Sequence, residues 1–125
     1  MRQKEKILKT IQIENYIWLL YLVLIGLSFY SNFEEVKYFK YDDFKAKEKY
    51  RKTNIVIFSI ALLVYIYFFY DNYETVVKRD IDTTSSKMFF DDLNLLASTL
   101  FLIAGIILLF IAVNDVNIET EIAFN

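Results

Sequence analysis

The sequence predicts an all-α integral membrane protein with three transmembrane helices, of which at least the second extends beyond the bilayer. Hydrophobic residues make up 56% of the 125-residue chain, against about 45–50% in an average soluble domain. The chain has two glycines and no proline, so it lacks residues that tight turns need. Its charged residues leave three long uncharged stretches. We therefore expect one membrane domain, residues 1–125, built from a few long helices.

The first uncharged stretch comprises the nineteen residues between Glu14 and Glu34, NYIWLLYLVLIGLSFYSNF. A helix needs about 20 apolar residues to cross a hydrocarbon core about 30 Å thick, so we expect a span over about residues 15–33. Basic residues precede this stretch, as in a signal peptide. However, SFYSNF, which follows the apolar run, lacks the small-x-small pattern of a cleavage site. We interpret the segment as an uncleaved signal-anchor helix.

The second uncharged stretch comprises the eighteen residues between Lys52 and Asp71, TNIVIFSIALLVYIYFFY. It is rich in β-branched and aromatic residues, which favour strands in soluble proteins. However, a single segment can cross lipid only as a helix, because every backbone N–H and C=O must be paired within it. We expect a span over residues 53–70. The preceding sequence, DDFKAKEKYRK from Asp42, contains no helix breaker, so this helix should continue beyond the bilayer.

The third uncharged stretch comprises twenty-two residues, LNLLASTLFLIAGIILLFIAVN, and predicts a span over residues 93–114. Polar connections over 34–52 and 71–92 and an acidic tail over 115–125 complete the domain.

The second connection contains DTTSS, Asp82 to Ser86, which is typical of a loop with helix-capping residues. The adjacent carboxylates of Asp91 and Asp92 are expected to cap the third helix and to interact with its dipole. Asn54 and Asn94, near the ends of their stretches, are expected to face lipid headgroups.

A soluble helical bundle is the alternative architecture. Its helices would each need a polar stripe facing water, and none of the three stretches has one. The aromatic residues also favour the membrane. Tyr16 and Trp18 begin the first stretch and Tyr65, Tyr67 and Tyr70 crowd one end of the second. Tyrosine and tryptophan gather where acyl chains meet headgroups.

Basic residues do not decide the orientation of the chain in the membrane. The four segments outside the spans contain four, seven, three and zero lysines and arginines, which places seven on each side. The basic N-terminal segment and the acidic tail favour an N-terminus inside and a C-terminus outside, whereas the basic first connection, residues 34–52, favours the reverse.

Composition argues against most chemistry. The chain has no histidine and no cysteine, the commonest ligands of zinc and haem iron, and the acidic residues match no calcium loop. We expect no enzyme activity, no catalytic residue, no cofactor and no metal. A net charge of −2 does not favour nucleic acid, and no small-molecule substrate is indicated. The spans contain no charge, whereas ion pathways usually contain charged residues.

Helix packing is the interaction that the third span favours. Its small residues recur at steps of seven or eight and form a stripe on one side of the predicted helix, which we call the small-residue stripe: Ala97, Ser98, Ala104, Gly105 and Ala112. Small residues let transmembrane helices approach closely. The stripe is interpreted as a contact surface for another protein or a second copy. Alternatively, it packs against the chain's own first two helices.

The sequence therefore predicts a non-catalytic accessory or scaffold subunit that acts through helix–helix contacts. The alternative is a small pore-forming or immunity-type membrane protein. Its expected partners are the lipid bilayer and membrane-protein helices, including copies of itself. The expected location is a multi-pass position in a bacterial plasma membrane, with an organelle membrane as the alternative, because the amino-acid usage is typical of AT-rich coding DNA.

Overall fold

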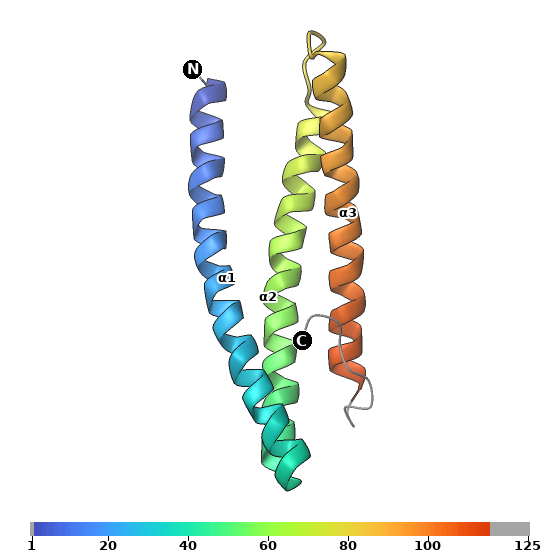
Figure 1. Cartoon of the computed structure of the whole chain (residues 1–125). Helices are drawn as coiled ribbons and strands as arrows, with labels where there is room; N and C mark the ends of the chain where they lie inside the picture. Colours follow the sequence, from blue (N-terminus) through green and yellow to red (C-terminus); the bar gives the residue numbers. More distant parts are fainter. Residues whose placement is uncertain (1, 116–125) are drawn as a thin grey trace. The chain divides into compact units, whose positions relative to one another are not determined.

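The computed structural model describes residues 2–115, and these residues form three long α-helices. The helices are α1, Arg2–Tyr41, α2, Phe44–Val77, and α3, Ser85–Asn114 (Figure 1). Each contains a stretch that is long and apolar enough to cross a membrane. The all-helical architecture expected from the sequence is confirmed.

All three helices are longer than a membrane crossing requires. They contain 40, 34 and 30 residues, which correspond to about 60, 51 and 45 Å at a rise of about 1.5 Å per residue. A hydrocarbon core is about 30 Å thick. The helices therefore continue through most of the segments that separate the uncharged stretches, as the absence of helix breakers indicates.

The chain divides into two compact units, and the boundary falls within α2 between Ile57 and Phe58. The first unit contains α1 and the beginning of α2. The second contains the rest of α2 together with α3.

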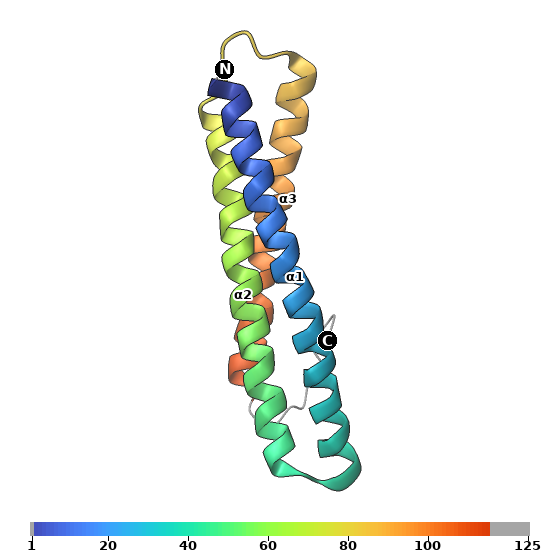
Figure 2. The same cartoon turned by 90° about the vertical axis from the view of Figure 1, so that its left-hand side faces the viewer.

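In the first unit, a two-residue turn joins α1 to α2 (Figure 2). Asp42 has a positive φ of 51°, a left-handed conformation that aspartate tolerates better than most residues. Asp43 caps α2, because its Oδ1 accepts hydrogen bonds from the backbone N–H groups of Lys45 at 3.1 Å and Ala46 at 3.3 Å. Aspartate is among the residues that most often cap a helix N-terminus, and Asp43 does so here.

In the second unit, α3 begins earlier than its predicted span. Thr84 is the N-cap residue, and its hydroxyl accepts a hydrogen bond from the backbone N–H of Lys87 at 3.2 Å. The expectation that Asp91 and Asp92 cap this helix is wrong, since Thr84 of DTTSS already caps it about two turns earlier.

Both of these carboxylates form ion pairs instead. Asp91 Oδ2 lies 2.7 Å from Lys87 Nζ, one turn away on α3. Asp92 Oδ1 lies 2.5 Å from Nη2 of Arg79, which follows the end of α2. Arg79 also donates from Nε to the carbonyl oxygen of Val76 at 3.0 Å, so it satisfies a carbonyl at the C-terminus of α2.

The helix α3 ends at Asn114, where the predicted span also ends. The backbone N–H of Asp115 donates to the carbonyl oxygen of Ile111 at 2.8 Å. The rest of the predicted acidic tail, residues 116–125, lies outside the described residues.

Candidate functional site

The small-residue stripe divides between two sides of α3. Ser98, Gly105 and Ala112 are buried and follow one another at steps of seven residues. Ala97 and Ala104 are exposed. Because successive residues of an α-helix are about 100° apart, each exposed alanine lies a quarter-turn away from the buried line.

The buried line contacts α2 within the second unit. A Cβ atom added to Gly105 would lie 2.8 Å from Cδ2 of Tyr65 and 3.4 Å from Cδ1 of Leu62. Glycine is therefore needed there for the close approach of the two helices. The ring of Tyr65 also stacks on Phe101, with centroids 5.6 Å apart and an angle of 27° between the planes.

A hydrogen bond joins the same two helices near the loop. The amide Nδ2 of Asn72 donates to Oγ of Ser98, and Ser98 Oγ donates in turn to the carbonyl oxygen of Asn94 at 2.8 Å. Asn72 belongs to the predicted polar connection 71–92, but in the structure it lies within α2. Ser98 and Gly105 thus help to hold α3 against the chain's own α2.

The side of α3 that contains Ala97 and Ala104 is different. Large apolar side chains around and between these alanines are exposed, including Leu100 at 58%, Phe101 at 59% and Ile103 at 49%. Small residues on an exposed helix face let another transmembrane helix approach closely. This part of the stripe remains accessible.

A second polar contact lies in the first unit, close to the turn between α1 and α2. Ser31 Oγ donates to Oδ1 of Asn54 at 2.6 Å, and these residues are 0% and 2% exposed. Glu34, one turn after Ser31, is also buried, and its Oε1 lies 3.8 Å from Nζ of Lys37. Asn54 was expected to face headgroups; instead it pairs α2 with α1.

These arrangements suit packing and hydrogen bonding. Within residues 2–115, no three carboxylates come together in a way that would hold a metal ion. The polar contacts of Asn54 and Asn72 join helices.

No family model, no curated protein and no solved structure matches this chain.

Proposed function

We propose that this protein is a non-catalytic accessory or scaffold subunit of a membrane, with a bacterial plasma membrane as its location. It acts by presenting the exposed side of α3 to another transmembrane helix. The observation that supports this proposal is the accessible position of Ala97 and Ala104 on the most apolar of the three helices.

The exposed surface of the helices is apolar, which favours contact with lipid over contact with water. Large apolar side chains are exposed along α1, α2 and α3, with Trp18 at 66%, Leu63 at 67% and Phe110 at 66%. Soluble monomers rarely expose contiguous apolar patches larger than a few hundred Å². The three candidate spans are consistent with a small multi-pass membrane protein.

Helix association in lipid needs more than apolar surface, since lipid tails are as apolar as leucine. Close packing against small residues supplies the missing attraction. Ser98 and Gly105 already engage residues of α2. Ala97 and Ala104, about 10.5 Å apart along the helix, are the members of the stripe that are left for a partner.

The substitution Ala104→Leu, alone or with Ala97→Leu, tests the proposal. We expect the protein reconstituted in lipid nanodiscs or mild detergent to associate about tenfold more weakly, a change of about 1.4 kcal/mol. The matched control is Ile103→Leu, which alters an exposed neighbour without changing its volume. Gly105→Leu is less informative, because it disturbs the packing of α3 on α2.

An unchanged complex size for both alanine variants would contradict the proposal. Release of a small dye from vesicles that contain the protein would contradict it as well, since it would favour the pore-forming alternative.

A further inference from the structure

The helix α1 exposes a stripe of eight apolar residues and two asparagines that is longer than a bilayer is thick. Its positions alternate at steps of three and four residues, and every one of them is exposed. We call it the α1 stripe: Leu8, Ile11, Asn15, Trp18, Leu22, Ile25, Phe29, Asn32, Val36 and Phe39. From Leu8 to Phe39 it extends for about 46 Å at about 1.5 Å per residue.

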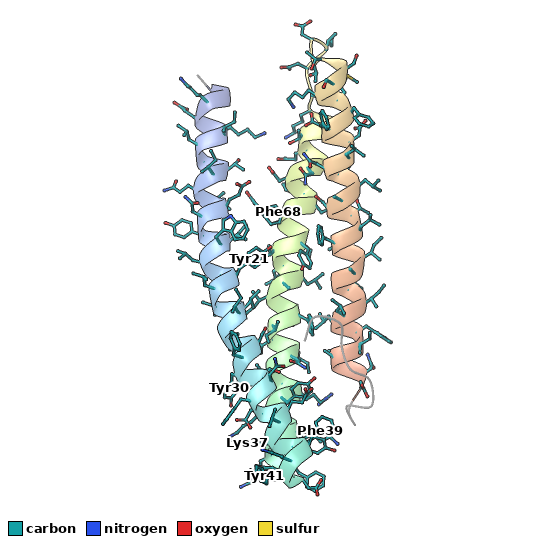
Figure 3. All side chains as sticks on the ribbon, viewed as in Figure 1. Tyr21, Tyr30, Lys37, Phe39, Tyr41 and Phe68 are labelled. Atoms are coloured by element: carbon teal, nitrogen blue, oxygen red, sulfur yellow. The ribbon has the colours of Figure 1, made fainter. Side chains whose placement is uncertain are left out.

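Both ends of the α1 stripe pass beyond the predicted span, residues 15–33. Leu8 is 63% and Ile11 48% exposed among charged residues at one end, and Val36 is 54% and Phe39 65% exposed at the other. Figure 3 labels Lys37, Phe39 and Tyr41 in the last turns of α1, with Phe39 on the other side of the helix from Lys37 and Tyr41. Lipid tails cover only about 30 Å of the stripe, so its ends lie outside the hydrocarbon core, where a protein surface can cover them.

The spacing identifies the kind of surface. Apolar residues at alternating steps of three and four form the a and d positions of a heptad repeat, which packs against a helix with the same repeat. In this register Leu8, Asn15, Leu22, Phe29 and Val36 are the a positions, and Ile11, Trp18, Ile25, Asn32 and Phe39 are the d positions.

We propose that the partner is a second copy of this chain, with the two α1 helices parallel and in register. Such a pair places Asn15 beside Asn15 of the other copy, and Asn32 beside its counterpart. A carboxamide both donates and accepts hydrogen bonds, so each asparagine complements itself across the two-fold axis. An asparagine at an a position sets register in two-stranded coiled coils.

Charge supports the same arrangement. Glu35 and Lys40 lie at the two edges of the α1 stripe, in heptad positions g and e, five residues apart. Neither forms an ion pair with another residue in the part of the chain that the structure describes. In a parallel pair, position g of one helix faces the next e position of the other. Glu35 of each copy would therefore meet Lys40 of its neighbour, twice in a symmetric dimer.

The inference deepens the proposed function, since it names a partner and a second surface. It rests on that proposal only in assuming that α1 crosses the membrane. Substitutions on α3 do not alter the α1 stripe, so the two contacts can fail separately.

Disulfide cross-linking tests the dimer, because the chain has no native cysteine. Single substitutions Ile11→Cys, Leu22→Cys and Val36→Cys lie on the α1 stripe. The controls Val23→Cys and Tyr30→Cys are exposed at b positions on another face. After oxidation of the full-length protein in liposomes, we expect about tenfold more disulfide-linked dimer at the stripe positions than at the controls.

Equal cross-linking at stripe and control positions, or none at the stripe, would overturn the proposal. Cross-linking at Leu22 but not at Ile11 and Val36 would overturn it too, because it would indicate an antiparallel pair. In such a pair the middles of the two α1 stripes meet, whereas a residue near one end lies far from the same residue of the other copy.

A charge exchange supplies a second readout. Glu35→Lys should lower the dimer fraction at Leu22→Cys about threefold to fivefold, as expected for two exposed pairs. The double variant Glu35→Lys with Lys40→Glu should restore it. Failure of the restoration would contradict the parallel register. If no cross-linking occurs along the α1 stripe while Ala104→Leu still weakens association, the proposed function is supported and only the α1 dimer is contradicted.

Discussion

The ring of Tyr65 lies so close to Gly105 that a Cβ atom on residue 105 would meet Tyr65 Cδ2 at 2.8 Å. Phe101, one turn earlier on α3, stacks on the same ring and limits how far it can move aside. Gly26, the other glycine of the chain, has nothing within 4 Å of the equivalent position. The two glycines therefore form a matched pair for mutation.

We expect Gly105→Ala to lower the free energy of unfolding by about 1 kcal/mol. Overpacking costs about 1–3 kcal/mol, and the better helix propensity of alanine recovers about 1 kcal/mol. Gly26→Ala gains the propensity without the clash, so its stability should be unchanged or higher. Circular dichroism during denaturation in detergent micelles measures both, and equal effects at the two glycines would contradict the close contact with Tyr65.

The hydrogen bond between Ser31 and Asn54 gives a second prediction. Ser31→Ala leaves the buried Oδ1 of Asn54 without this donor, which should cost about 1–3 kcal/mol. Ser28→Ala is the control, because Ser28 Oγ donates to the carbonyl oxygen of Leu24, so this hydrogen bond stays within α1. A double-mutant cycle with Asn54→Leu should show coupling above about 0.5 kcal/mol. Additive effects would exclude the contact.

The three helices could be predicted because their causes are local. Long uncharged stretches and the lack of glycine and proline act within each segment, and no tertiary contact is needed to identify them. The helix ends were less predictable. DTTSS and the Asp91–Asp92 pair both contain residues that cap helices, and the structure shows that Thr84 is the residue that does so.

The polar contacts between helices could not be predicted, because they depend on register. Ser31 and Asn54 are 23 residues apart, and Asn72 and Ser98 are 26 apart. Each pair meets only once two helices have packed with a particular offset. The division of the small-residue stripe has the same origin. All five residues look alike in sequence, and packing of α2 alone decides that Gly105 is buried while Ala104 is exposed.

Replacing Arg79 should destabilise the last turn of α2 more than replacing its ion-pair partner Asp92 does. Asp92 has a side chain that is 60% exposed, so Asp92→Asn should cost no more than about 1 kcal/mol. Arg79→Ala also removes the hydrogen bond to the carbonyl oxygen of Val76. We expect faster hydrogen–deuterium exchange in the last turn of α2 for Arg79→Ala than for Asp92→Asn. Equal exchange in the two variants would show that Arg79 stabilises the end of α2 through the ion pair alone.

Conservative substitutions of Thr84 test its role as the N-cap residue of α3. Thr84→Ala should destabilise the second unit by about 1 kcal/mol, whereas Thr84→Ser, which keeps the hydroxyl, should have little effect. Thr83→Ala controls for loss of a neighbouring threonine. Should Asp91→Ala prove more costly than Thr84→Ala, α3 would begin later than Ser85.

Cysteine labelling tests the membrane arrangement on which the proposals depend. Lys40→Cys lies at the end of α1 and Ser85→Cys at the start of α3, so the 34 residues of α2 separate them. Since α2 is long enough to cross a core about 30 Å thick, the two thiols should lie on opposite sides. With the N-terminus inside, an impermeant maleimide should label Lys40→Cys in intact cells and Ser85→Cys only after permeabilisation. The reverse result would invert the orientation, and labelling of both from the outside would show that α2 does not cross the membrane.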